Sequence, residues 1–274
     1  MTAHEEAQAA ATRAGVVIRH ADSPEACRTA TAIIDEIWPL DSGSLVDPNL
    51  LRALQHSGSY VALAEAEGEP VGVCLGFFSS PPDVHLHSHI AAVLPGSALR
   101  GVGYAMKLDQ RAWALDRGVT AIEWTYDPLV RRNAWFNLRR LGGRVADYLV
   151  DFYGQMSDGR NRDFGSDRVL VHWDLTAPLP VSQPDGEPGG PVDEILEESS
   201  DGRPIVLGAP AADRSATVAV PADIEELRAT EPDIARAWRP AVRETLGAAV
   251  MAGTHTIGVD DAGRYLLRHR EDAG

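Results

Sequence analysis

The segment Val84–Lys107 constrains the fold of this chain more than any other. It begins with Val84–Val93, in which apolar and polar residues follow one another as in a half-buried β-strand. A short loop then leads to Arg100–Gly103, whose two glycines are typical of a helix start that approaches a ligand closely. Amides of a first helical turn have no acceptor within the helix and point outward at the positive end of the helix dipole. The pattern therefore predicts a strand, a loop and a helix whose first turn binds an anion such as a phosphate.

Two kinds of phosphate-containing cofactor fit such a loop. A dinucleotide fold has three glycines directly after a buried strand and an acidic residue about 20 residues later. Glu123 stands at that spacing from Gly103, but Met106 occupies the place of the third glycine. Residues 95–99 also separate the strand from the first glycine. A nicotinamide cofactor is therefore the weaker interpretation.

The same segment resembles the GNAT superfamily of acyl-CoA N-acyltransferases, whose hallmark is a strand, then Arg/Gln-x-x-Gly-x-Gly/Ala, then a helix. Aligned without a gap, which we favour, the hallmark falls on Ala98–Gly103 and Ala98 replaces the Arg or Gln; aligned two residues later, it falls on Arg100–Ala105 and keeps the arginine. The resemblance implies that acetyl-CoA, succinyl-CoA or another acyl-CoA binds here. The implied contact residues are Val93, Leu94, Leu99, Arg100, Gly101, Val102, Gly103, Tyr104, Ala105 and, from a later helix, Asn133.

Other segments fit an α/β (α+β) fold with a mixed central sheet flanked by helices. We expect strands at 16–20, 60–65, 70–78, 84–93, 121–126, 145–153 and 169–175, and helices at 24–38, 48–56, 104–117 and 131–141. The order β-α-α-β-β-β-α-β-α-β-β is what the resemblance implies for a GNAT domain at 15–177. The run Asn133–Gly142, with His-Ser-His before the loop, further resembles a subgroup of bacterial GNAT proteins that carry a C-terminal extension.

Four parts are expected along the chain. Residues 1–14 form an N-terminal tail, 15–177 the GNAT domain, 178–203 a linker rich in Pro, Gly and acidic residues, and 204–274 a small α+β extension. In the extension we expect strands at 204–207 and 216–220, a helix starting at Pro221, a helix at 234–251 with a kink or break at Pro240, and a hairpin at 254–267. It carries no chemical motif. Either it covers the core or forms a homodimer contact, or it is a lid that shapes the acceptor pocket.

Composition excludes several classes of partner. Lys and Arg number 25 against 40 Asp and Glu, which gives a net charge of −15 that repels nucleic acid and anionic membranes. Cys27 and Cys74 are too few for a disulfide framework and indicate a reduced, cytoplasmic chain. No apolar run is long enough to span a membrane, and the start lacks the basic and apolar regions of a signal peptide. The expected partner is a small molecule.

Three alternating histidines are the candidate bases. A primary amine is protonated at neutral pH and must lose a proton before it attacks a thioester. Histidine titrates near neutrality, and the alternation of His85, His87 and His89 directs all three to one strand face. The spacing resembles the arylalkylamine N-acetyltransferases, which implies His87 and His89 as the base pair; the alternative is that the histidines are solvated or structural. A metal site is not expected, because no third ligand stands at a suitable spacing.

Glu123 and Tyr126 lie on the next expected strand, which the resemblance places beside the thioester. Glu123 either acts as a base, binds the substrate ammonium, or is an exposed strand carboxylate. The general-acid Tyr of the family is replaced by Leu138, so the proton for the thiolate comes from water or from another side chain. The candidates for that side chain are Tyr126, Asn137, Tyr148 and Tyr153. The predicted function is acyl transfer to the amine of a small molecule such as an amino acid; the alternative is an acyl-CoA-binding module without turnover.

Overall fold

The structure is a computed structural model that describes residues 1–95, 100–156, 162–180 and 191–269. It divides into two compact units. The first consists of Met1–Trp124 with Asp174–Ala177, and the second contains the other described residues from Thr125 onward. The chain passes between the units inside strand β5, before Asp174 and after Ala177. The last of these crossings is where the expected linker at 178–203 begins.

Five strands form the sheet of the first unit, in the order β1-β2-β3-β4-β5. They are β1 (Val17–His20), β2 (Tyr60–Ala66), β3 (Glu69–Phe78), β4 (Leu86–Val93) and β5 (Ala121–Tyr126). Neighbours from β1 to β4 are antiparallel, whereas β4 and β5 are parallel. The mixed sheet and the expected order of elements are confirmed, and strand β5 has the predicted bounds.

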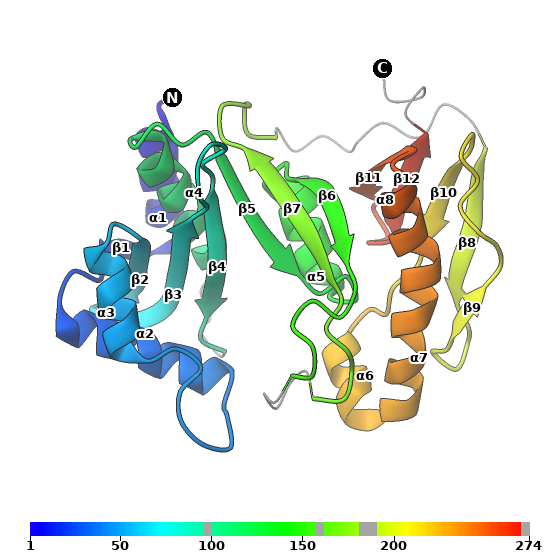
Figure 1. The fold of residues 1–274 in the computed structure, drawn as a ribbon, viewed down its shortest axis with the longest axis horizontal. Helices are drawn as coiled ribbons and strands as arrows, with labels where there is room; N and C mark the ends of the chain where they lie inside the picture. The colour runs from blue at the N-terminus through cyan, green and yellow to red at the C-terminus, as the bar shows by residue number, and fades with distance from the viewer. Residues whose placement is uncertain (96–99, 157–161, 181–190, 270–274) are drawn as a thin grey trace. The chain divides into compact units, whose positions relative to one another are not determined.

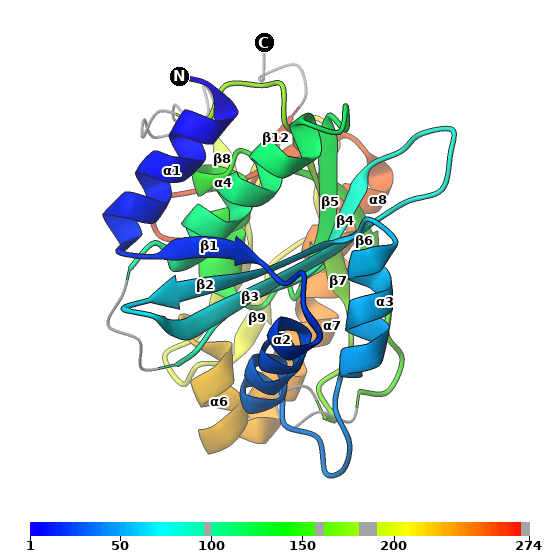
Figure 2. The same ribbon diagram turned by 90° about the vertical axis from the view of Figure 1, so that its left-hand side faces the viewer.

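Helices cover both faces of this sheet (Figures 1 and 2). They are α1 (Ala3–Ala14), α2 (Pro24–Ile37), α3 (Pro48–His56) and α4 (Val102–Leu115). Helices α2 and α3 pack with one face, where Ile34 and Leu51 are fully buried against strand residues such as Leu75. Helices α1 and α4 pack with one another and lie on the opposite face. Burial of apolar side chains on both faces is what fixes the sheet in the interior.

Helix α1 corrects the expectation of an N-terminal tail. Thr2 caps it in a capping box with Glu5, which satisfies amides of the first turn. Its buried stripe is made of alanines, among them Ala7 and Ala14, and Arg111 of α4 bonds Glu6 at 2.7 Å. Small side chains allow α1 to pack closely on α4, so the alanine-rich composition indicates a packed helix and not a disordered segment.

Strand β4 contains one residue more than its partner requires. Leu75 of β3 pairs with Ile90, but the next residue, Gly76, pairs with Ser88, so His89 has no partner in β3. A bulge of this kind changes the side toward which the strand presents its residues. Ser88 points toward α4, whereas Ile90 belongs to the core formed with α2 and α3. The regular alternation expected for 84–93 is therefore interrupted at His89, and the strand begins at Leu86.

The second unit contains the remaining strands and the C-terminal helices. Strand β6 (Arg144–Leu149) pairs antiparallel with β7 (Arg168–Asp174). A separate sheet has the order β11-β12-β10-β8-β9, formed by β8 (Val192–Glu198), β9 (Pro204–Val206), β10 (Ser215–Val218), β11 (His255–Val259) and β12 (Tyr265–His269). The helices are α5 (Arg131–Ala134) with the π-helical turn η1 (Trp135–Arg140), α6 (Ile224–Thr230), α7 (Pro232–Val242), the π-helical turn η2 (Arg243–Gly247) and α8 (Ala248–Ala252).

Two expectations for this unit need correction. Strand β8 lies inside the segment expected to be a linker, although residues 181–190 lie outside the described part of the chain. Pro221 does not start a helix, because α6 begins at Ile224 and is capped by Asp223. The interruption expected at Pro240 is confirmed, because the helical segment at 234–251 is divided by η2, which follows this residue and its missing amide. The hairpin of β11 and β12 is confirmed.

Candidate active site

Two histidines of β4 share an aromatic neighbour. The ring of Phe77 on β3 lies 5.2 Å from the ring of His87 and 5.7 Å from that of His89, measured between centroids. The two imidazole rings are 6.0 Å apart. Phe77 is the β3 partner of His87, so it lies on the same side of the sheet. Both imidazoles thus lie beside Phe77, and His87 is half-buried whereas His89 is exposed.

The third histidine contacts a carboxylate. His85 lies just before β4, where its amide donates to Ser79 Oγ at 2.9 Å. Its Nε2 is 3.2 Å from Oε2 of Glu123 on β5, and its Nδ1 is 3.3 Å from the carbonyl oxygen of Asp83. A histidine held at both ring nitrogens has a fixed orientation. The structure thus brings Glu123 to His85, whereas sequence reasoning singled out His87 and His89.

His87 is uncharged at neutral pH. The pKa of His87 is lowered to about 4, mainly by burial and also by the neighbouring His89, His85 and Lys107, while Glu123 opposes the shift. Desolvation also lowers the pKa of His89, although this residue remains accessible to solvent. Uncharged imidazoles have a lone pair that can accept a proton from an ammonium or from water. Because its pKa is near 4, His87 can accept a proton only briefly at neutral pH and then releases it to another group or to water.

A buried lysine lies on the opposite side of β4. Lys107 of α4 is 3% exposed, and its Nζ donates to Ser88 Oγ at 2.7 Å and to Gln110 Oε1 at 3.4 Å. The ammonium also lies 3.9 Å from the centroid of the Trp124 ring. Burial lowers the pKa of Lys107 to about 8. Sequence reasoning missed this residue, because a single lysine in a helix is ordinarily solvated.

The first turn of α4 follows β4 as expected. Gly101 precedes the helix with a φ of 89°, a conformation that favours glycine, and the helix begins at Val102 and not at Tyr104. A Cβ placed on Gly103 meets no atom within 4 Å, so space is open beside this turn. The first-turn amides of Val102 and Gly103 have no acceptor within the helix itself. This geometry fits a phosphate group.

The other residues predicted to contact the cofactor differ in their exposure to solvent. Ala105 is fully buried and its amide bonds the carbonyl oxygen of Gly101, so we remove it from the candidate set. Leu94 packs against the core of α2 and α3. Val93 and Tyr104 are partly exposed and Arg100 is exposed. Leu99, together with Ala98 of the gapless alignment, lies outside the described residues. Asn133, in the second unit, is partly exposed on α5.

Most candidate proton donors of the second unit are engaged in its interior. Tyr126 is buried, its hydroxyl lies 3.1 Å from that of Tyr265, and burial raises the pKa of Tyr126. Tyr148 donates to Asp167 at 2.9 Å, and burial raises its pKa as well. Tyr126 also points to the other side of β5 from Glu123, as the alternating burial of the strand shows. We therefore leave Tyr126 out of the catalytic set.

Of the remaining candidate donors, Tyr153 is 42% exposed, and its hydroxyl lies 3.3 Å from Thr125 Oγ1. Asn137 and Leu138 are buried in η1.

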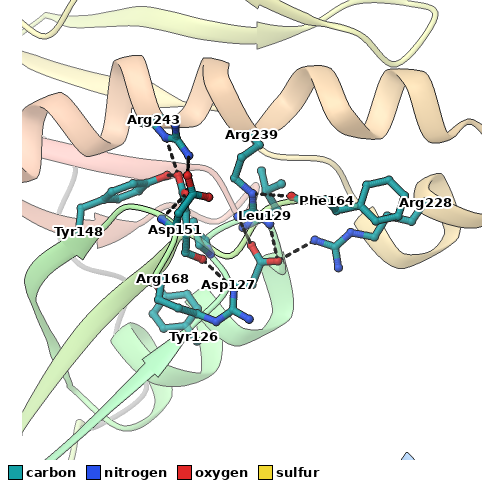
Figure 3. A network of polar contacts seen from close by, with 12 residues as sticks. Tyr126, Asp127, Leu129, Tyr148, Asp151, Phe164, Arg168, Arg228, Arg239 and Arg243 are labelled. Carbon is teal, nitrogen blue, oxygen red and sulfur yellow. Dashed lines mark hydrogen bonds and ion pairs between the residues drawn. The ribbon is translucent and has the colours of Figure 1, made fainter. Parts of the chain in front are cut away.

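Two buried aspartates connect the C-terminal helices to the rest of the second unit (Figure 3). Arg239 of α7 donates to both carboxylate oxygens of Asp127, at 2.7 and 2.8 Å, and Arg228 of α6 donates at 2.7 Å. Arg243 donates to both oxygens of Asp167, at 2.9 and 2.6 Å. Burial alone raises the pKa of Asp127, but the arginines outweigh it and hold that pKa well below its usual range. These contacts support a structural role for the extension.

No group of three or more His, Cys, Asp and Glu side chains arranged for a metal ion occurs within residues 1–95, 100–156, 162–180 and 191–269. Nor does this part of the chain contain a helix with the length and apolarity needed to cross a bilayer.

Comparison with known proteins yields similarity to solved structures. No protein-family model matches the chain, and no curated protein does. An N-acetyltransferase from Staphylococcus aureus Mu50 is similar with a TM-score of 0.47 and 16% identity, over 59% of this chain and 99% of that one. The ribosomal-protein-S18-alanine N-acetyltransferase from Escherichia coli gives a TM-score of 0.45 and 12% identity, over 60% and 96%.

An acetyltransferase of the GNAT family from Streptococcus pneumoniae gives a TM-score of 0.46 and 13% identity, over 57% of this chain and 98% of that one. At these levels, the similarity assigns neither a family nor a substrate to this chain.

Proposed function

We propose that the chain is an acyl-CoA-dependent N-acyltransferase that acts on the amine of a small molecule. The observation that carries this proposal is the continuity of β4 with α4. Strand β4 supplies His87 and His89, and the chain then enters a helix whose first turn has open space at Gly103. The hallmark resemblance of residues 98–105 and the observed order of elements support the same reaction.

In this proposal, residues of the first unit bind the cofactor and move the proton. The amides of Val102 and Gly103 bind the diphosphate of acyl-CoA, which supplies the activated acyl group. His87 and His89 accept the proton that the acceptor ammonium must lose, directly or through water. The free amine then forms the C–N bond as the C–S bond breaks, and the thiolate takes a proton from solvent. Glu123 orients His85 or binds the ammonium of the acceptor.

A second candidate is a module that binds acyl-CoA without turnover. Two observations favour it: Leu138 stands where the resemblance implies a tyrosine acid, and a pKa of about 4 makes His87 a weak base. Both candidates require the same first-turn contact, so they differ only in chemistry. A nicotinamide enzyme requires a different cofactor.

Two measurements separate these possibilities. Calorimetry with acetyl-CoA and, separately, with NAD tests the cofactor; we expect heat of binding from acetyl-CoA alone, and binding of NAD alone would refute the proposal. Release of free thiol from acetyl-CoA, succinyl-CoA and other acyl-CoA donors, followed with a panel of amino acids and other small amines, tests turnover. Binding without thiol release for any amine would favour the binding module.

A further inference from the structure

The ammonium of Lys107 is buried among neutral groups. Its contacts are the hydroxyl of Ser88, the amide oxygen of Gln110 and the face of the Trp124 ring. No carboxylate forms an ion pair with it in the part of the chain that the structure describes. A charged group that leaves water without a counter-ion costs stability, and such costs concentrate at functional sites.

Lys107 contacts the strand that carries the histidines through Ser88. Ser88 lies between His87 and His89, and consecutive residues of a strand point to opposite faces. Ser88 therefore points to α4, where Lys107 donates a hydrogen bond to it, and the register shift follows directly at His89. The ammonium therefore lies behind the histidines, on the opposite side of the strand from Phe77.

Several charged or titratable groups act on His87. His89 is on the same strand, His85 precedes it, Glu123 faces it from β5, and Lys107 acts from α4. Glu123 favours the imidazolium, whereas Lys107 disfavours it. A fixed positive charge across the strand thus opposes protonation of His87 without occupying the histidine side.

We propose that Lys107 is a positioning residue for the histidines: it holds Ser88 next to the bulge at His89, and its positive charge is one of the groups that disfavour the imidazolium of His87. The catalytic meaning of this role rests on the proposed function. The electrostatic coupling between Lys107 and His87 does not, and can be measured in a protein without activity.

The test is a titration of the His87 ring protons by NMR in the full chain. Lys107→Met removes the charge, and we expect the midpoint of His87 to rise by several tenths of a pH unit to about one unit. Ser88→Ala keeps the charge of Lys107 and removes its hydrogen bond to residue 88. The titration midpoint of His87 should then stay unchanged, while the difference in chemical shift between the His87 and His89 ring protons changes. Lys107→Gln retains a donor for Ser88 and gives the same comparison if the methionine variant does not fold.

Arg117→Met is the matched control. Arg117 lies at 3.8 Å over the ring of Trp113 near the end of α4 but is exposed, so its loss should leave the His87 midpoint unchanged. An unchanged midpoint in folded Lys107→Met or Lys107→Gln protein overturns the inference. A shifted midpoint supports it. If the midpoint of His87 shifts in the Lys107 variant but neither the variant nor the parent releases thiol, the coupling between Lys107 and His87 stands and only the proposed acyl transfer fails.

Discussion

The carboxylate of Glu123 lies 3.2 Å from Nε2 of His85, although the Cα partner of Glu123 across the parallel strands is His87. The side chain of Glu123 therefore leans along the sheet to reach a residue that precedes β4. Together with the bond from His85 to Asp83, this contact fixes one imidazole while His87 and His89 remain in contact with Phe77. The three histidines thus have different surroundings and need not share one role.

Replacement of Glu123 tests the value of this contact. Glu123→Gln removes the charge that orients His85 or binds an ammonium, and we expect kcat/KM to fall about 10- to 100-fold. Affinity for acetyl-CoA, measured by calorimetry, should stay within about twofold. Glu65→Gln is the control, since Glu65 is also a strand carboxylate and pairs only with the exposed Arg19 in the described contacts. Equal kcat/KM in both variants would remove Glu123 from the mechanism.

Loss of both strand histidines should impair proton transfer. We expect the double variant His87→Ala with His89→Ala to lose about 100-fold in kcat/KM near pH 7, with acetyl-CoA affinity nearly preserved. Because the lowered pKa of His87 keeps it unprotonated down to about pH 4, the parent should retain activity in mild acid and lose it as pH falls further. His56→Ala at the end of α3 is the control. Full activity of the double variant at pH 7 would contradict these roles.

The open space at Gly103 predicts a selective effect on binding. In Gly103→Val the new side chain meets no protein atom at its Cβ but enters the space beside the first-turn amides. We expect acetyl-CoA affinity to fall at least about tenfold, which corresponds to about 1.4 kcal/mol, with Tm nearly unchanged. Gly208→Val is the control for replacing a glycine with valine away from the site, because a Cβ there makes only an ordinary contact with Ile195. Unaltered calorimetric affinity would refute this cofactor site.

Asp127 should matter for folding. Asp127→Asn leaves Arg239 and Arg228 facing a neutral amide in a buried site, so we expect the free energy of unfolding to fall by about 3–5 kcal/mol in urea titrations at pH 7. The pKa of Asp127 is lowered on folding, so its contribution is present above about pH 4 and disappears only in stronger acid. Asp201→Asn, in an exposed ion pair, should change stability little. A loss no larger than that of Asp201→Asn would show that the network is dispensable.

Lys107 should leave a signature in the pH dependence of stability. Its pKa is about 8 in the folded chain and near 10.5 when unfolded, so between these values the unfolded chain binds the extra proton. Stability of the parent relative to Lys107→Met should therefore rise with pH across that window, by up to about 3 kcal/mol. Urea titrations at pH 7, 8, 9 and 10 measure the difference. A difference independent of pH would mean that the ammonium is not buried in solution.

Much of the fold follows from local chemistry in the sequence. Ser23 and Asp47 accept bonds from amides of the first turns of α2 and α3, and each helix begins with a proline that suits that turn. Ala121–Tyr126 alternates and becomes β5 with the predicted bounds. Each of these signals lies within a few neighbouring residues, so it can be recognised in the sequence without knowledge of the tertiary contacts. The tail interpretation of α1 failed because alanine packing depends on α4, which is far away in sequence.

The candidate site was predicted in its residue types more than in its contacts. The histidines and Glu123 stand out by kind and spacing, but the bulge at His89 depends on how β3 pairs with β4. Lys107 meets Ser88 only after α4 packs on the sheet, and no local pattern marks it. Asp127 and Arg239 are separated by 112 residues, so their ion pair could not be predicted from the sequence around either residue. The expected homodimer contact and the identity of the acceptor stay predictions.

The surplus residue of β4 is itself a histidine. Every other residue of that strand has a Cα partner in β3, so a chain shortened by His89 alone could form an uninterrupted ladder with all remaining pairs intact. The sheet gains no pairing from this imidazole, and hydrogen bonding between strands offers no reason for its presence. His89→Ala removes the ring and keeps the bulge, whereas deletion of His89 removes both, so a comparison of the two variants separates the effect of the imidazole from that of the strand distortion.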